Sequence, residues 1–229
     1  MSLRLLFRKA GGIYKEEGLM GLATEAREFV KYRKKGSYQS RRTDNDERYE
    51  LIKPHISDTD QSLLDIGCAE GMLTTRFSKA GIFCIGCDIS VTRISRARNN
   101  NEATDGPGFI FHKFTPESIP KIPHFDVILL LTVIHHWYDS YGWEAAEEML
   151  RETGRKSNKL FFEPPDRKLD RPDLDVEPDS SIEEYYEEYI DTVFQDEIEH
   201  TFLGKTSYRD EERSDPLFYI DTSNYGDKR

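Results

Sequence analysis

Apolar residues gather in short runs along the middle of the chain, and these runs alternate with more polar segments. Five runs are apolar and rich in β-branched or aromatic residues, as buried strands are: LLDI (63–66), IFCIGCDI (82–89), FIFH (109–112), DVILLL (126–131) and KLFFE (159–163). The segments between them that are long enough for helices are MLTTRFSKA (72–80), VTRISRARNN (91–100) and WEAAEEMLRETG (143–154). Strands that alternate with helices predict right-handed βαβ units and a parallel sheet, and near-continuous apolar runs suit strands covered on both faces.

The N-terminal part has a different pattern. Residues 3–35 carry apolar side chains at helical spacing, and a Gly-Gly pair divides them into two predicted helices. A polar linking segment then leads into a helix that ends near Ile52, because Pro54 limits its continuation. We therefore expect a helical extension over residues 1–53.

Beyond the fifth run, the pattern predicts one more helix and two more strands. Ser181 and Glu184 have capping-box spacing, and one stripe of the helix that follows is apolar: Ile182, Tyr186, Tyr189, Ile190 and Val193. Residues 200–223 resemble two strands joined by a charged hairpin loop. Residues 54–229 are therefore predicted to form a single α/β domain.

The composition fits a soluble protein with a full core. Of the 229 residues 37% are hydrophobic, and no apolar run approaches the roughly 20 residues that span a bilayer. The apolar stretch of the N-terminus is too short for a signal peptide, and the cysteines are too few and too crowded for a disulfide framework. Cys84 and Cys87 fall in one predicted strand and point to opposite faces, so no metal site is expected. We expect a cytoplasmic protein.

The net charge of −11 is unevenly distributed. Residues 1–53 hold 13 Lys and Arg against 8 Asp and Glu, residues 54–162 hold 11 against 14, and residues 163–229 hold 8 against 21. The balances are therefore +5, −3 and −13. A basic head and an acidic tail can attract different partners, such as phosphates at one end, although solvated surfaces explain the same charges.

The first residues also fit a short helix at a membrane surface. Its apolar and basic side chains would be Leu3, Leu6 and Phe7 with Arg4, Arg8 and Lys9. Such a helix would make the protein peripheral to the inner face of the membrane. A lid over the active site or a dimer contact is the alternative, and the sequence leaves the oligomeric state open.

The stretch SLLDIGCAEGMLT (62–74) ends a predicted strand with a glycine turn and at once begins a helix. Gly67 permits a backbone geometry and a close approach that a side chain would obstruct, and N–H groups at the helix start can receive a polar or anionic group. Asp88 ends the next strand about 20 residues later, where a carboxylate accepts hydrogen bonds from ribose hydroxyls. A P-loop is excluded because no G-K-[ST] follows, and the full G-x-G-x-x-G of NAD enzymes is absent. The pattern favours a nucleotide or nucleoside site.

The ordered trio LLDIGCAEGMLT, CIGCDIS and FDVILLLTVIHHW resembles the class I S-adenosylmethionine-dependent methyltransferase family, over roughly residues 60–165. The resemblance implies a Rossmann-like, mostly parallel seven-stranded sheet with helices on both faces, closed by an antiparallel pair. It implies S-adenosyl-L-methionine as cofactor, with Asp88 holding the ribose hydroxyls and Ile89 packing on the adenine. The residues that it places around the methionine part of the cofactor are Asp65, Gly67, Cys68, Ala69 and Gly71.

Several other residues are candidates for this site or its rim. Thr115 stands where the family often has an acidic residue near the adenine, and Thr132, at the end of the fourth strand, is assigned to the cofactor site. Arg41 and its neighbour Arg42 can reach the cofactor carboxylate or an anionic acceptor, or they are exposed linker arginines. Glu163, at the end of the fifth strand, can hold or orient an acceptor, or it is a surface carboxylate.

Methyl transfer is an in-line displacement in which the protein positions donor and acceptor and can add a general base. In this fold the residues just after the fourth strand face the methyl group, and here they begin with His135 and His136. Either imidazole can take the proton of a hydroxyl acceptor. In an extended segment only one of the two would point inward, and the other would pack structurally. Trp137, Tyr138 and Tyr141 are candidates for the wall of the acceptor pocket, or for ordinary core.

Weaker likenesses bear on the acceptor. SYQSRRTDNDERYELIKPHI, TVIHHWYDSYGWEAAEEML and FFEPP resemble the methylphosphate-capping RNA methyltransferases, and the same region resembles methyltransferases of sugar and polysaccharide pathways. EEGLMGLATEAREFVKYRKK resembles helices found beside glycan-building enzymes. We expect O-methylation of a small polar molecule or sugar, such as a glycan or glycolipid precursor. RNA is the alternative acceptor, disfavoured by the acidic tail, and a non-catalytic binding module is the second alternative.

Overall fold

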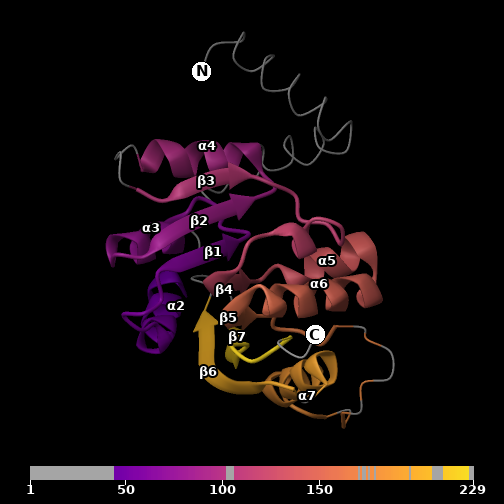
Figure 1. Cartoon of the computed structure of the whole chain (residues 1–229). Coiled ribbons are helices and arrows are strands. Elements are labelled where there is room, and N and C mark those ends of the chain that lie inside the picture. Colours follow the sequence, from indigo (N-terminus) through magenta and orange to yellow (C-terminus); the bar gives the residue numbers. More distant parts are fainter. Residues whose placement is uncertain are drawn as a thin grey trace.

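The computed structural model describes residues 44–226 except 102–105, 170, 172–173, 175, 178, 196 and 208–213. Across this part of the chain, seven strands form one sheet in the order β3-β2-β1-β4-β5-β7-β6 (Figure 1). The strands are β1 (Ser62–Ile66), β2 (Phe83–Asp88), β3 (Gly108–Phe111), β4 (Phe125–Leu131), β5 (Ser157–Glu163), β6 (Glu199–Ser207) and β7 (Ser214–Asp221). The first five run parallel, whereas β7 is antiparallel to both of its neighbours, β5 and β6. The predicted Rossmann-like sheet with an antiparallel pair is confirmed.

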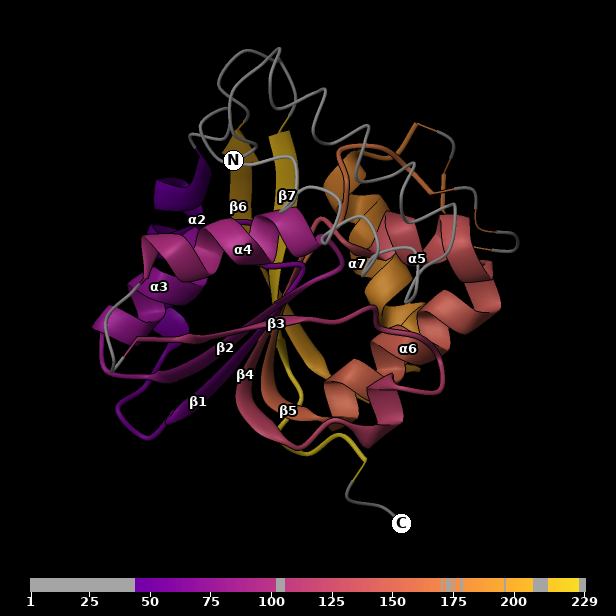
Figure 2. The ribbon, with the colours of Figure 1, turned by 90° about the horizontal axis from the view of Figure 1, so that it is seen from above.

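Helices cover both faces of the sheet, as Figure 2 shows. One face carries α2 (Asp44–Ile52), α3 (Met72–Lys79) and α4 (Val91–Asn100), and the other carries α5 (Ile134–Tyr141), α6 (Trp143–Arg155) and α7 (Ile182–Phe194). Two short 3-10 turns, η2 (Lys53–His55) and η3 (Ile119–Lys121), follow α2 and precede β4. Among the described helices, none is both long and apolar enough to cross a membrane.

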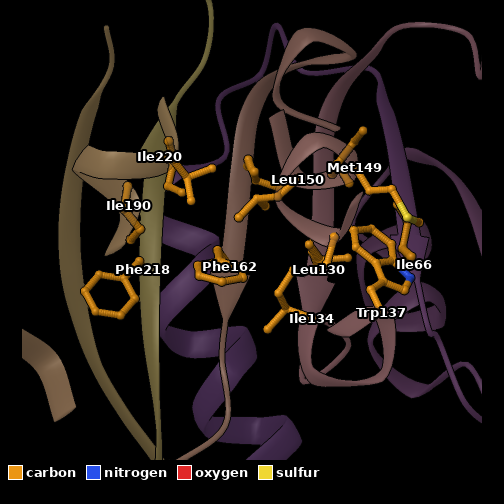
Figure 3. Close-up of a cluster of buried hydrophobic side chains, with 14 of the residues drawn as sticks. Ile66, Leu130, Ile134, Trp137, Met149, Leu150, Phe162, Ile190, Phe218 and Ile220 are labelled. Atoms are coloured by element: carbon orange, nitrogen blue, oxygen red, sulfur yellow. The ribbon is translucent and has the colours of Figure 1, made fainter. Parts of the chain in front are cut away.

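A separate apolar core lies on each face of the sheet. Between the strands and α5, α6 and α7, the packed side chains include Ile66, Leu130, Trp137, Leu150 and Phe162 (Figure 3). Between the strands and the helices α2 and α3, they include Tyr49, Ile52, Leu73 and Phe77. The central strands are therefore covered on both sides, which explains why their sequences are almost continuously apolar.

Two cysteines of β2, three positions apart, contribute to different cores. Cys87 belongs to the core under α5 and α6, whereas Cys84 belongs to the core under α3. The two thiols face opposite sides of the sheet, as the two-residue period of a strand predicts.

The α2 helix packs into the core although the sequence places it in an N-terminal extension. The rings of Tyr49 and Phe77 lie 4.9 Å apart between centroids, and Ile52 is fully buried. The boundary between residues 1–53 and 54–229 stays a prediction. The two helices expected before residue 36, their membrane, lid or dimer contact, and Arg41 lie outside the described residues.

The start of α7 follows the sequence prediction closely. The Ser181 hydroxyl accepts a hydrogen bond from the Glu184 N–H at 3.1 Å, and the Ser181 N–H donates to the Glu184 carboxylate at 2.8 Å. Both halves of the capping box are therefore present. The apolar stripe predicted for this helix is buried in the core at Tyr186, Tyr189 and Ile190.

The segment after β4 differs from the prediction. We expected extended chain at His135 and His136, but this segment is the helix α5. Ile134 and Trp137, three positions apart, share its buried face, which fits the helical period of 3.6 rather than strand alternation. Gly142, with φ of 81°, ends α5 and begins α6.

Candidate functional site

A cavity of about 440 Å³ opens at the carboxyl ends of the parallel strands. Its walls come from the turns after β1, β2, β3 and β4, together with α2, α4 and α5. In doubly wound sheets, ligands bind at this edge. The cavity brings together ten of the residues predicted from the sequence: Asp65, Gly67, Cys68, Ala69, Asp88, Ile89, Thr132, His136, Trp137 and Tyr141.

The glycine turn after β1 is fastened to the end of β2. The N–H groups of Gly67 and Cys68 both donate to the carbonyl oxygen of Cys87, at 2.8 and 2.9 Å. Gly67 has a φ of +81°, and a Cβ added there would lie 2.5 Å from Cγ2 of Val133. The turn therefore needs glycine for its backbone conformation and for its close approach to the chain after β4.

Asp88 ends β2 as a buried carboxylate on the cavity wall, only 3% exposed. Its Oδ2 accepts the N–H of Ala69 at 3.0 Å, and its Oδ1 accepts the N–H of Ser90 at 2.7 Å. Arg93 from α4 lies 3.8 Å from Oδ2. These bonds fix the orientation of the Asp88 carboxylate.

Asp65 is a second buried carboxylate, at the end of β1. It accepts a hydrogen bond from the Thr74 hydroxyl at 2.6 Å. Burial raises the pKa of Asp65 from 3.8 to about 6, and the Asp88 charge adds to the rise, whereas the Thr74 bond and the Arg48 charge oppose it. Burial and the Asp65 charge also raise the pKa of the Cys68 thiol, so this thiol is a neutral part of the wall.

Arg48 is a cavity residue that sequence reasoning missed. It comes from α2, lines the cavity and is only 4% exposed. Its Nε donates to Oε1 of Glu163 at 2.9 Å, and its Nη2 pairs with Oε2 of the same carboxylate. Glu163 is fully buried and outside the cavity lining, so it is not the rim carboxylate that we expected.

Aromatic side chains of α5 form the other side of the cavity. His136 is exposed and lines it, beside the buried indole of Trp137. The Tyr141 hydroxyl donates to the Phe114 carbonyl oxygen at 3.1 Å, which ties α5 to the loop after β3. His135 lies outside the lining, with its ring centroid 4.0 Å from that of His136. The helix therefore brings one histidine, His136, to the cavity.

Three further predicted residues lie away from the cavity. The Thr115 N–H donates to the Ser118 hydroxyl in the turn before η3, and Phe114 lines the cavity in its place. The Tyr138 hydroxyl donates to the Glu147 carboxylate at 3.0 Å, in the core between α5 and α6, so it does not form the acceptor wall that we expected. Gly71 begins α3 with φ of +77°, and a Cβ there would collide with a phenylalanine ring of β3.

The known proteins that this chain resembles are described as methyltransferases. A family model described as a methyltransferase domain matches residues 64–156, from β1 to the end of α6. The ubiquinone biosynthesis O-methyltransferase of Rhodopseudomonas palustris (strain HaA2) is 35% identical over 77 residues, which are 34% of this chain and 30% of that protein. The protein of the same name from Methylococcus capsulatus is 26% identical over 124 residues, 53% of this chain and 51% of that protein. The chain thus spans about half or less of the length of these curated relatives.

Solved structures of methyltransferases share the fold. The bifunctional kinase-methyltransferase WbdD superimposes with a TM-score of 0.57 and 17% identity, over 77% of this chain and 38% of that chain. The magnesium protoporphyrin IX methyltransferase of Synechocystis PCC 6803 with bound S-adenosylmethionine has a TM-score of 0.53 and 18% identity, over 77% of both chains.

Proposed function

Because residues 64–156 form a domain of the class I S-adenosylmethionine-dependent methyltransferases, we propose that the protein transfers the methyl group of S-adenosylmethionine to an oxygen atom of a small polar acceptor. A sugar hydroxyl of a glycan or glycolipid precursor is the acceptor that we favour. The observation that carries the proposal is that Asp88, the glycine turn, His136 and Tyr141 all line one cavity.

The residues of the cavity fit the cofactor. Asp88 is a buried carboxylate with its oxygens fixed by two backbone N–H groups, and it would hold the ribose hydroxyls. Ile89 leaves 46% of its side chain exposed beside the cavity, and it would pack on the adenine. Gly67 lets the turn approach the Val133 side chain, with which a Cβ would collide, and the methionine part would pass along this turn. Asp65 lies next to this turn and would face the ammonium group.

The cofactor supplies an electrophilic methyl group on a sulfonium centre. The residues of the cavity would hold the acceptor hydroxyl in line with that methyl group, which is the arrangement that in-line transfer to oxygen requires. His136 would accept the hydroxyl proton. Trp137 and Tyr141 would form the apolar sides of the acceptor end, which exclude water from the reacting atoms.

The choice of oxygen rests on the relatives, because those that match in sequence are named O-methyltransferases. The choice of a small acceptor rests on charge and size. Residues 163–229 carry a balance of −13, which disfavours a long polyanion such as RNA. A cavity of about 440 Å³ is in the range of small-molecule sites.

Calorimetry with S-adenosylmethionine and S-adenosylhomocysteine tests the cofactor. If the protein binds neither compound, the proposal is rejected. The acceptor is tested by transfer of labelled methyl into a cell extract that is then separated into RNA, protein, lipid and small glycans. We expect label in glycan or lipid that His136→Ala abolishes, whereas label in RNA would overturn the choice of acceptor.

A further inference from the structure

The Arg48–Glu163 ion pair is buried, and its Arg48 lines the cavity. Both carboxylate oxygens of Glu163 face the Arg48 guanidinium, and the Thr206 hydroxyl of β6 also donates to Oε1. The side chain of Arg48 is 5% exposed and that of Glu163 is 0% exposed. The pair thus ties α2 to β5 and β6, although these elements are far apart in the sequence. A bidentate pair of this kind fixes the plane as well as the position of the guanidinium.

The same pair holds the end of β4. Thr132 has a φ of +56°, a left-handed conformation that is rare for a β-branched residue. Its N–H donates to the Glu163 carbonyl oxygen at 2.7 Å, and its hydroxyl lies 3.3 Å from the Glu163 carboxylate. The Arg48 Nη2 donates to this hydroxyl at 3.0 Å. These bonds stabilise a strained residue that lines the cavity, which is where such strain is usually functional.

Arg48 lines the same cavity as Asp65, the carboxylate at the end of β1, and its charge acts on that carboxylate. The groups around Asp65 are the Arg48 guanidinium from α2, the Thr74 hydroxyl from α3, the Asp88 carboxylate from β2, and the thiols of Cys68, Cys84 and Cys87. Asp88 repels the Asp65 charge, and burial disfavours it. Arg48 is the cation that opposes both effects.

We infer that Arg48, oriented by Glu163, is a positioning residue for the cofactor side of the cavity: it fixes Thr132 at the end of β4 and places its positive charge in the cavity that Asp65 also lines. This inference rests on the proposed function. It also gives Glu163 a role, because a carboxylate with no exposed surface acts through its partner and not on the acceptor. The helix α2 thereby becomes part of the cofactor site.

The test uses the double variant Arg48→Met/Glu163→Gln. Removing Arg48 alone would leave a buried unpaired carboxylate, which is strongly destabilising and can prevent folding. The double variant removes the cation from Asp65 without leaving that charge. We expect the affinity for S-adenosylhomocysteine at pH 7 to fall by about tenfold or more. The pH below which binding is lost should rise by about one pH unit, because Asp65 is then harder to ionise.

Two controls separate positioning from general damage. Glu163→Gln alone keeps the cation near Asp65, so its pH limit should not rise. Arg76→Met removes a different arginine that ties α2 and α3 at the surface, through Asp46 and Glu50, and it should bind as the wild type does. Equal losses of affinity in the double variant and in both controls would show a structural role only. A double variant with unchanged affinity would overturn the inference.

A titration of the Asp65 carboxyl by carbon-13 NMR in the ligand-free protein makes the test independent of the cofactor. We expect its pKa to be higher in the double variant than in the wild type. If wild-type protein binds no S-adenosylhomocysteine but this difference is present, the proposed function fails and the coupling of Arg48 to Asp65 stands. If the two titrations coincide, the inference fails whatever the protein binds.

Discussion

The Asp88 carboxylate accepts the backbone N–H of Ala69 at 3.0 Å, so the acid that ends β2 is oriented by the turn that follows β1. Two signals that lie 19 residues apart in the sequence therefore form one structural unit. Ala69 itself has a left-handed conformation, with a φ of +51°. The geometry of the turn and the position of the acid depend on each other.

Asp88→Ala should weaken binding of S-adenosylmethionine by about tenfold to a hundredfold, because it removes hydrogen bonds to a charged acceptor. Asp126→Ala is the matched control. Asp126 is the second residue of β4, at the edge of the sheet opposite the cavity. Its Oδ2 also accepts two backbone N–H groups, from Gln61 and Ser62. Calorimetry should show loss of binding for the first variant only, while thermal unfolding reports the stability lost by both. Equal binding by the two variants would contradict the assignment of Asp88.

Gly67→Ala should lower both stability and cofactor affinity. The residue has a φ of +81°, and the new Cβ would lie 2.5 Å from Val133 Cγ2. Gly81→Ala is the control, because Gly81 has a φ of +100° with no atom within 4 Å of an added Cβ. It should cost about 1 kcal/mol of stability through backbone strain alone and leave affinity unchanged. Denaturation curves measure the stability of the two variants, and calorimetry measures their affinity for the cofactor. A loss of affinity in both variants would count against a local effect at Gly67.

The parts of the fold that the sequence predicted are those with local causes. The capping box at Ser181 and the glycine turn at Gly67 need only neighbouring residues, and both are present in the structure. The helix α5 was missed although Ile134 and Trp137 already have helical spacing in the sequence, because the segment follows the β4 run almost directly. Both side chains belong to the core, so the spacing was a usable signal.

Arg48 was missed for a different reason. Its segment is polar and reads as a linker, and its partner Glu163 lies 115 residues further along the chain. A signal was nevertheless present. Arg48 lies four positions before the fully buried Ile52 on the same face of α2, and a carboxylate that ends a buried apolar strand needs a partner. Pairing these two observations would have suggested the contact.

Asp65→Asn should stabilise the protein at pH 8 while it weakens cofactor binding. The pKa of Asp65 rises from its ordinary 3.8 to about 6 in the folded state, so the folded state holds the proton more tightly than the unfolded state. The stability that Asp65 contributes is therefore fully present below its ordinary pKa and is lost as the pH rises through about 6. That loss is about 3 kcal/mol at most, and an amide does not incur it.

Urea denaturation at pH 4 and at pH 8 measures this difference. The variant should gain stability over the wild type at pH 8 and gain little at pH 4, where Asp65 is largely protonated. A gain of the same size at both pH values would show that packing, and not the buried charge, causes the effect. Asp139→Asn, which alters an exposed carboxylate of α5, should show no such pH dependence.

His136→Ala should lower kcat for methyl transfer by about a hundredfold to ten-thousandfold, the usual contribution of a general base. His135→Ala is the matched control, because its ring is adjacent to that of His136 but lies outside the cavity lining, so its kcat should fall by less than about tenfold. Both variants should bind S-adenosylhomocysteine as the wild type does. Comparable losses of kcat would leave neither histidine identified as the base.

The pH dependence of the same reaction separates His136 from Asp65, which both line the cavity. A base on the acceptor side acts after both ligands have bound, so its protonation lowers kcat. Protonation of Asp65 instead weakens cofactor binding, so it raises the KM for S-adenosylmethionine. In His136→Ala the acid limb of kcat should therefore disappear while the rise in KM at low pH remains. If the acid limb of kcat persists in that variant, His136 is not the group that takes the proton.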